Sequence, residues 1–451
     1  MSFIQDVFSG VEKLLLGAIG SAVESASHIK IDKKHYQPGD VELVDITLMS
    51  SDQQRKYSLM EICKGIDLYE SVLSPVMFCE LIISDSAGVL QSFPILGGEY
   101  VSVSFRTPRN KTAPITFLFV INSVENKKVN ESNKNLTYTL VCVSAELLRN
   151  SKKHISMKIT DNVTNIIQNI FSIDLGSQKP LELESTDGIH EIRFTRLTPL
   201  QAIDYLRQRA SSKRYQSGSF CFYENRKGFH FASLERMLYE GAEKAKAGGT
   251  DKAFFFDTSR HESIENVTAR NIIAYNRLQF GDTLTQIQSG GLNNQVQGFD
   301  LITGDLRKTT YTDNLGADKF KSSSSTSSSA KTTSFVREHG KTTIVKKVIT
   351  TRSDKPEVDI AEKMTKVTAF AQKIAQNITQ IHIYGDSDIN VGDVIECRFP
   401  SGVDAKKGEG TSRLDSGNYL VTKVRHIILN TDRPQYTQAL ELIKTDIQEV
   451  V

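Results

Sequence analysis

Cysteine and histidine side chains supply most metal sites and many nucleophiles, so their spacing is the first chemical signal in this sequence. The five cysteines are Cys63, Cys79, Cys142, Cys221 and Cys397. They are odd in number, widely spaced and mostly inside apolar runs, and no CxxC pair or Cys/His cluster occurs. This pattern predicts buried, reduced thiols in a protein that folds in a cytoplasm, and neither a disulfide framework nor a zinc site.

The nine histidines are scattered, and His382 and His426 have no metal-ligand spacing to another histidine or cysteine. We expect solvated or strand-face histidines at both positions. The sequence has no GxGxxG, HExxH or GxSxG motif and no Walker phosphate-binding loop. We therefore predict no catalytic, metal-binding or cofactor-binding residues, no cofactor and no enzymatic activity. Carboxylate pairs for glycoside hydrolysis stay open, because such pairs form in space and leave weak sequence traces.

Charge gives little reason to expect nucleic acid or an anionic membrane as the main partner. The chain has 55 basic and 53 acidic residues, and its formal net charge is +2. The basic stretch Lys341 to Lys347 has no interleaved aromatic residues, which favours a solvated loop rim over a nucleic-acid site. No segment approaches the ~18 apolar residues of a membrane span, and the N-terminus lacks the basic region of a signal peptide.

Two β-rich regions enclose a helical one in this chain of 451 residues, a length that indicates two to four domains. Regular short strands with turn signals between them suggest a barrel or sandwich. We predict a first β-domain over 36–150, an α+β insertion over 151–252 and a second β-domain over 253–451. The fold class is therefore mainly β with an α+β insertion.

The insertion is predicted from a change of period. Helical spacing follows Thr160, a candidate N-cap, and a second helix begins at Thr198-Pro199, where Gln201 can complete a capping box. A hairpin is expected around 225–228, followed by an Ala/Gly/Lys-rich link near 241–252. In the second β-domain, the serine-rich stretch at about 320–334 predicts a mobile surface loop, and a helix is expected over about 357–378.

The N-terminal segment 1–35 reads as an amphipathic helix and linker. Its apolar stripe consists of Ile4, Val7, Phe8, Val11, Leu14 and Leu15. Gly10, Gly17 and Gly20 weaken it as a free helix, so it needs a surface on which to lie. That surface could belong to the same chain or to a partner, and we take the six stripe residues as a candidate partner-binding site.

Three stretches resemble the central baseplate hub proteins of contractile-tailed bacteriophages and the related hub portion of type VI secretion spike proteins. The first is the segment 93–103 with its Gly-Gly-Glu turn, and the second runs from Thr198-Pro199-Leu200 through 217–224 to 231–234. The third combines 391–395, 416–421, His426 and 436–442. The order of these stretches is the stronger signal, and the likeness covers 36–445 in outline.

The resemblance implies a structural hub of a phage tail baseplate with two tube-like β-barrel domains in one chain. Three chains would form a ring with a central channel, in which six barrels adapt a threefold spike to a sixfold tail tube during contractile injection. The implied partners are two further copies, a spike protein, tail-tube or tube-initiator proteins, other baseplate subunits and the tape-measure protein, with DNA only in transit. The implied location is the virion tail baseplate, assembled in the host cytoplasm.

Two other classes of function stay open at this point. One is a tail-associated muralytic or depolymerase enzyme subunit, which activity on purified cell wall would reveal. The other is a host-surface binding protein, which would bind whole cells as an isolated chain, whereas a hub protein should bind only tail components.

Overall fold

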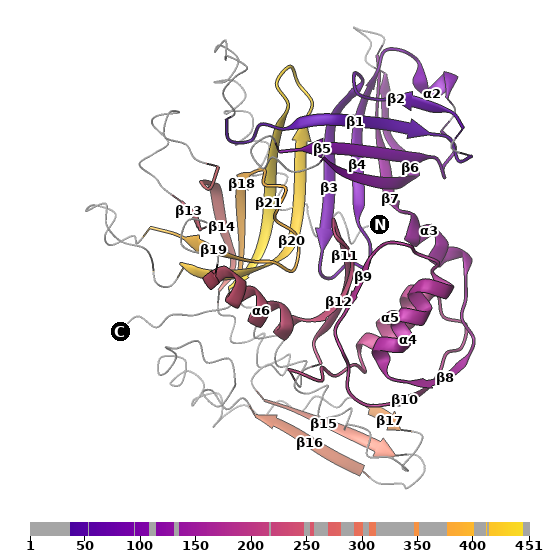
Figure 1. Ribbon diagram of the computed structural model, residues 1–451, viewed down its shortest axis with the longest axis vertical. Coiled ribbons are helices and arrows are strands. Elements are labelled where there is room, and N and C mark those ends of the chain that lie inside the picture. Colours follow the sequence, from indigo (N-terminus) through magenta and orange to yellow (C-terminus); the bar gives the residue numbers. More distant parts are fainter. Residues whose placement is uncertain are drawn as a thin grey trace. The chain divides into compact units, whose positions relative to one another are not determined.

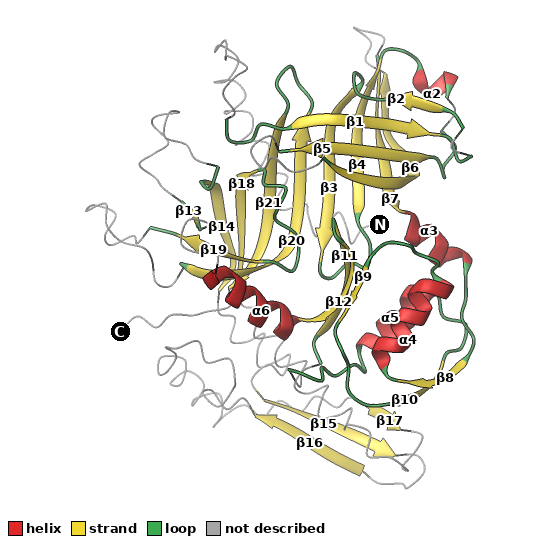
Figure 2. Ribbon diagram, viewed as in Figure 1, coloured by secondary structure: helices red, strands yellow, loops and turns green. Residues whose placement is uncertain are grey.

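The computed structural model describes residues 37–107, 114–129, 135–247, 253–256, 269–280, 293–300, 306–312, 347–350, 377–400, 412 and 415–444, apart from 53, 94 and 216–217. The protein is mainly β, as the sequence predicts (Figures 1 and 2). The N-terminal stripe, the serine-rich loop and residues 357–376 of the expected helix lie outside the described residues. No helix in the described part of the chain is long and apolar enough to cross a membrane.

The first β-region consists of β1 to β7 and the short helix α2 (Val89–Ser92). Its strands are β1 (Glu42–Met49), β2 (Lys56–Ser58), β3 (Cys63–Ser71), β4 (Phe78–Asp85), β5 (Tyr100–Arg106), β6 (Ile115–Val129) and β7 (Leu136–Ser144). Between β2 and β3, a turn places buried Leu59 in the core, and Cys63 N bonds to Leu59 O. Figure 1 shows β1 and β5 lying across β3 and β4. The buried side chains of these strands form one hydrophobic cluster, so the sheet folds over its own core.

The inserted region follows β7 and mixes short helices with short strands. Its elements are α3 (Ala145–Lys152), β8 (Lys158–Asp161), α4 (Val163–Asn169), the short π-helix η2 (Ile170–Asp174), β9 (Leu181–Leu183), β10 (His190–Arg193), α5 (Pro199–Arg207), β11 (Phe220–Asn225), β12 (Gly228–Ser233) and α6 (Leu234–Ala247). The predicted hairpin is confirmed as β11–β12. The predicted capping box of Thr198 and Gln201 is also confirmed at the start of α5.

The second β-region returns to the main sheet. Its strands are β13 (Phe254–Phe255), β14 (Ile272–Phe280), β18 (Asn377–Tyr384), β19 (Val394–Arg398), β20 (Gly417–Leu429) and β21 (Gln435–Lys444). A separate three-stranded sheet has the order β16-β15-β17, with β15 (Asn293–Asp300), β16 (Leu306–Thr312) and β17 (Lys347–Thr350). The burial pattern of β21 alternates along the strand, with Tyr436, Leu440 and Leu442 on the core face.

One thirteen-stranded sheet includes both β-regions, with the order β14-β18-β21-β20-β3-β4-β7-β6-β5-β1-β2 and with β19 and β13 attached to β20. The two regions meet where β20 pairs with β3, from Lys423↔Ser71 to Leu429↔Gly65. We call this pairing the seam. Among the described strands the pairing path is open, ending at β14 and β2, so the two tube-like barrels stay a prediction.

The strand order repeats within the chain. In the first region the order is β3-β4-β7-β6-β5-β1, and in the second it is β14-β18-β21-β20-β19-β13. The strands also follow one another along the chain in the same sequence. One detail differs, because β1 pairs antiparallel with β5 whereas β13 pairs parallel with β19.

The register shifts also fall at equivalent places in the two regions. The repeat therefore extends from the strand order to individual residues. The register shifts between Ile121 and Ser123 on β6 and between Val421 and Lys423 on β20. It also shifts between Cys63 and Gly65 on β3 and between Ile272 and Ala274 on β14. A β-bulge is a designed feature of a strand rather than a random defect, so we treat β6 and β20, and likewise β3 and β14, as equivalent.

A turn is repeated in the same way. Gly98 donates its backbone N–H to Ile121 O, and Gly392 donates its own to Val421 O. The next residue, Glu99 in one region and Asp393 in the other, offers its carbonyl to the same strand. Both glycines have positive φ, 94° and 87°. Each following carboxylate also accepts the backbone N–H of the residue three positions earlier, Leu96 or Asn390.

Two local predictions are wrong. Thr160 lies in β8, and the cap of α4 is Asn162, whose side chain accepts the N–H of Asn165. The link expected near 241–252 is helical up to Ala247, since Ala, Glu and Lys are good helix formers.

Candidate functional site

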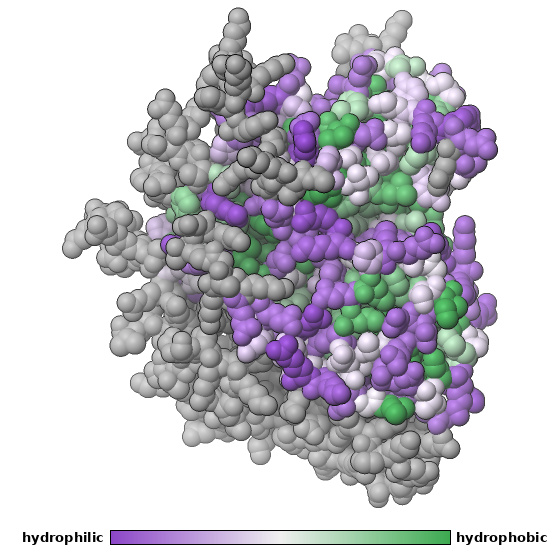
Figure 3. All heavy atoms as spheres, viewed as in Figure 1, coloured by the Kyte–Doolittle hydropathy of each residue, from purple (hydrophilic) through white to green (hydrophobic). Residues whose placement is uncertain are grey.

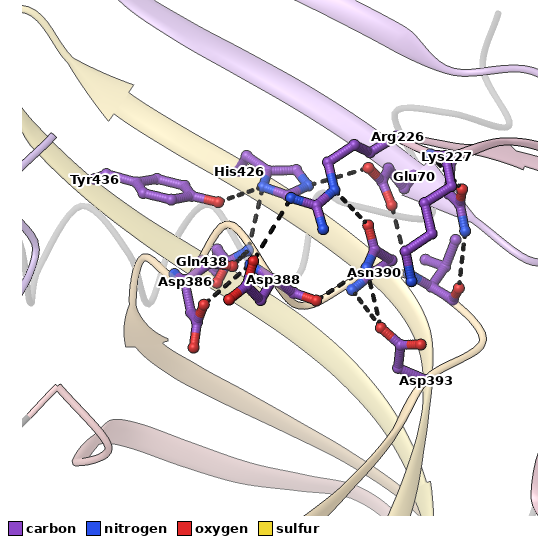
Figure 4. A network of polar contacts seen from close by, with 12 residues as sticks. Glu70, Arg226, Lys227, Asp386, Asp388, Asn390, Asp393, His426, Tyr436 and Gln438 are labelled. Atoms are coloured by element: carbon purple, nitrogen blue, oxygen red, sulfur yellow. Dashed lines mark hydrogen bonds and ion pairs between the residues drawn. The ribbon is translucent and has the colours of Figure 1, made fainter. Parts of the chain in front are cut away.

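The loop between β18 and β19 is the centre of a buried polar network (Figure 4). The Asp393 carboxylate accepts the backbone N–H of Asn390 at 2.9 Å and its side-chain amide at 3.1 Å. The same amide also donates to the carbonyl of Asp388 at 2.9 Å. Asn390 is buried, and its contacts fix the shape of the loop.

The tip of the β11–β12 hairpin reaches this loop. Arg226 Nε donates to Asn390 Oδ1 at 3.1 Å, and Arg226 also lies 3.8 Å from Asp388 Oδ1. Asn225 Nδ2 donates to the Val391 carbonyl at 3.4 Å. The guanidinium therefore supplies a positive charge beside this acidic loop, and it joins the inserted region to the second β-region.

His426 of β20 occupies the other side of the network, and its neighbours assign its proton. Gln438 Oε1 accepts the backbone N–H of Asp386, so Gln438 Nε2 is the donor that faces His426 Nδ1 at 3.2 Å. The Tyr436 hydroxyl lies 2.6 Å from the same nitrogen. Nδ1 therefore accepts, the ring proton is on Nε2, and Nε2 faces Glu70 Oε1 at 3.4 Å.

A hydroxyl, an imidazole and a carboxylate in this order can activate a nucleophile. In this protein the Tyr436 side chain is 0% exposed, and burial raises the pKa of its hydroxyl well above the usual value. Gly385 lies against the ring, and a Cβ on it would be 1.9 Å from Tyr436 Cδ1. A substrate cannot reach the hydroxyl, so this relay can connect β3, β20 and β21 but cannot attack a ligand.

A second buried network joins the inserted region to the first β-region. The Glu224 carboxylate accepts the backbone N–H of Met77 at 3.0 Å and the hydroxyl of Ser144. Lys179 Nζ lies between Glu224, at 2.6 Å, and Glu146, at 2.9 Å. Burial raises the pKa of Glu224. Burial alone would raise the pKa of Glu146 too, but Lys179 and Ser177 hold it below its usual value.

Apolar packing places β11 between two cores. Cys221 and Tyr223 belong to the cluster of the second β-region, together with Val72. Phe220 and Phe222 point the opposite way, into the cluster of the inserted region. At the end of this strand Glu224 reaches the first β-region, and Asn225 and the following Arg226 reach the second. The candidate site is thus a junction that positions three parts of the chain.

The sequence-predicted candidates are not brought together at this junction. The stripe Ile4, Val7, Phe8, Val11, Leu14 and Leu15 lies outside the described residues, and so does the basic stretch before Lys347. All five cysteines are free and buried, as predicted, and burial raises their pKa, to about 12 for Cys63 and Cys221. In the described part of the chain no group of three His, Cys, Asp or Glu residues could hold a metal ion.

Sequence reasoning misses the charged residues of the junction. It predicts a solvated or strand-face histidine at 426, and His426 lies on a strand but is buried. Glu224 ends the apolar run from Phe220 to Tyr223, Glu70 follows Leu68 and Tyr69, and both acids are buried. For Glu224, a lone acid at the end of an apolar strand was the available signal, because a buried carboxylate requires a partner.

Two solved structures share this fold over nearly their whole length. The tail protein from Neisseria meningitidis MC58 has a TM-score of 0.52 and 11% identity, over 89% of this chain and 96% of that chain. The prophage MuSo2 43 kDa tail protein from Shewanella oneidensis has a TM-score of 0.52 and 10% identity, over 89% and 98%. No protein-family model and no curated protein matches the sequence. The chain has the fold of these tail proteins, which confirms the resemblance at the level of the fold.

Proposed function

We propose that this protein is the structural hub of a phage tail baseplate, a trimeric ring with a central channel that adapts a threefold spike to a sixfold tail tube. The observation that carries the proposal is the fold shared with two tail proteins along nearly the full length of all three chains.

The internal repeat supports the adaptor role. Two equivalent strand orders in one chain give two equivalent units, and three chains then present six such units around one axis. A ring of this kind has threefold symmetry by chain and approximate sixfold symmetry by unit. Its two ends can therefore meet partners of different symmetry without any change of conformation.

The face of the main sheet opposite the core is polar at the seam, which supports a water-filled channel. Arg425 of β20 pairs with Asp67 of β3 at 3.2 Å, and Lys423 pairs with Glu441 at 2.8 Å. Along β20, Lys423 and Arg425 share one face with the buried Ile427, and Val424, His426 and Ile428 stand on the core face. We assign the charged face to the channel wall, along which DNA passes without a base-specific contact.

Light scattering and electron microscopy of the purified protein, alone and with its spike protein, test the proposal. We expect three chains per particle and a hollow ring. A monomer under both conditions would contradict the ring. Hydrolysis of purified cell wall would instead support a muralytic or depolymerase subunit, and binding of the isolated chain to whole cells would support a host-surface protein.

The N-terminal stripe has a separate place in this proposal. Burying one such apolar side chain is worth roughly 1.5–3 kcal/mol, and a glycine-containing helix does not hold itself in water. We assign residues 1–27 to docking on a neighbouring tail component, either a tube or baseplate subunit or the tape-measure protein. Deleting them should weaken tail assembly and leave the thermal stability of the isolated protein nearly unchanged. Unfolding of the isolated protein would place the stripe in its own core.

A further inference from the structure

The internal repeat identifies two strand edges, one on β6 and one on β14, whose equivalents β20 and β3 pair in the seam. In the seam, the C-terminal half of β20 continues beyond its pairing with β19 and pairs with β3. Its equivalent, the C-terminal half of β6, likewise continues beyond its pairing with β5, which ends at Val120. Among the described strands, the side of β6 from Ser123 to Val129 opposite β7 has no paired strand. The equivalent of β3 is β14, which pairs with β18 alone among the described strands.

From this equivalence we propose that β6 of one copy pairs with β14 of a second copy and so reproduces the seam between chains. This inference rests on the trimer of the proposed function and names its interface. The occupant of each edge is a second copy, because the chain already contains the same pairing once, between its own β20 and β3. A strand edge with unpaired backbone groups is a template for such an addition.

The registers on both sides predict which residues meet. Ile66 of β3 pairs with Ile428 of β20 in the seam. Tyr275 occupies the place of Ile66, since Tyr275 pairs with Ile381 as Ile66 pairs with Leu81. Val129 occupies the place of Ile428, since Val129 pairs with Leu136 as Ile428 pairs with Tyr436. Tyr275 of one copy should therefore lie opposite Val129 of the next.

Burial supports the same pair. Within the seam Ile66 is 1% exposed and Ile428 0% exposed, whereas Tyr275 is 45% exposed and Val129 67% exposed. Two large apolar side chains thus remain partly in water at the positions where the seam buries its own pair. Figure 3 shows only one face of the surface, on which hydrophobic patches are small and separated by hydrophilic residues. Pairing with a second copy would bury both side chains. An aromatic and a β-branched residue that face each other across two strands form a stabilising pair.

Cysteine cross-linking tests the register directly. The variants Val129→Cys and Tyr275→Cys are made in separate chains, mixed, reassembled and oxidised. Opposed strand residues have Cα atoms about 4.5–5.5 Å apart, within disulfide reach. The native cysteines are buried, so we expect a cross-linked dimer from the mixture and little from either variant alone. One chain with both cysteines should give a covalent trimer, because β18, β21, β20, β3, β4 and β7 separate β14 from β6 within a copy.

Controls separate this inference from the hub proposal. Leu73→Cys is equally exposed but belongs to the turn after β3, and mixed with Val129→Cys it should give no dimer. Val129→Asp should convert the particle to a monomer that keeps its circular dichroism spectrum and melting temperature. A trimer that is not cross-linked and tolerates Val129→Asp would overturn the β6–β14 pairing and leave the hub intact. A wild-type monomer would overturn both. Cross-linked trimers without any ring channel would sustain the pairing and overturn the hub.

Discussion

The equivalent strands β6 and β20 pass through the same bulge and then differ. After Lys423, β20 runs without irregularity to Leu429 and is covered by β3. After Ser123, β6 shifts register again between Glu125 and Lys128, where Asn126 has a φ of 52°. Its last residue is exposed, whereas the end of β20 is packed. Two equivalent strands therefore have different roles: β20 forms the seam within the chain, and the end of β6 has no paired strand among the described residues.

The difference shows how a duplicated unit becomes an asymmetric chain. Gln438 of β21 stands where β7 has Tyr138, since Gln438 pairs with Ile383 as Tyr138 pairs with Ile83. Gln438 is buried together with His426 and with Glu70 of β3. The seam thus contains buried polar partners, whereas the edge of β6 presents its backbone groups and an exposed apolar side chain.

The largest loss of folding stability is expected from breaking the contacts between Tyr436, His426 and Glu70 at the seam. His426→Ala removes the imidazole that faces the buried Glu70 carboxylate, whose other described partner is the Val391 N–H at 3.4 Å. An unsatisfied buried polar group costs about 1–3 kcal/mol and a charged one more, so we expect a loss of at least about 3 kcal/mol. Denaturant unfolding should show a loss of this size. Lys127→Ala, on the equivalent part of β6 and exposed, should change the free energy of unfolding by less than about 0.5 kcal/mol. An equally small loss for His426→Ala would mean that the relay does not hold the seam.

The second-largest effect is expected in the pH dependence of folding stability, to which a histidine in the second region contributes. His382 on β18 pairs with Ala439 and occupies the place that Ile82 has on β4. Burial, and then the nearby Arg425, lower the pKa of His382 to about 4. The unfolded chain binds a proton at about pH 6.5 and the folded chain does not, so stability should fall as the pH drops from about 6.5 toward 4.

The size of that loss is on the order of 3 kcal/mol, because each pH unit between the folded and unfolded pKa values corresponds to about 1.4 kcal/mol. Denaturant unfolding at a series of pH values measures it. His382→Ile copies the first region at this position and should remove this part of the slope, while the carboxylate titrations remain. If the wild-type and His382→Ile profiles stay parallel between about pH 6.5 and 4, the imidazole is not held neutral by burial.

The sequence predicts the β-rich character of the two regions and the hairpin, because alternation and turn residues are local signals. The capping box at Thr198 is equally local and was found. In the sequence the repeat shows only as two regions that are both β-rich, because equivalent residues such as Ile66 and Tyr275 differ in type. The junction could not be predicted, because its residues lie far apart in the chain: Glu70 meets His426 through the β3–β20 pairing, and Arg226 meets Asn390 where the hairpin reaches the loop.

The smallest effect should come from the repeated turn, where the two regions differ only in what covers the glycine. Ala at Gly98 or Gly392 would face a positive φ of 94° or 87°, a strain of about 1 kcal/mol in both regions. A Cβ at Gly98 would meet nothing within 4 Å, whereas one at Gly392 would lie 2.4 Å from the hydroxyl of Tyr223. Gly392→Ala should therefore lose about 1–3 kcal/mol more than Gly98→Ala in denaturant unfolding, because the hairpin must move. Combining Gly392→Ala with Tyr223→Phe removes the blocking hydroxyl and should recover part of the difference. Equal losses for the two single variants would show that the hairpin does not press on this turn.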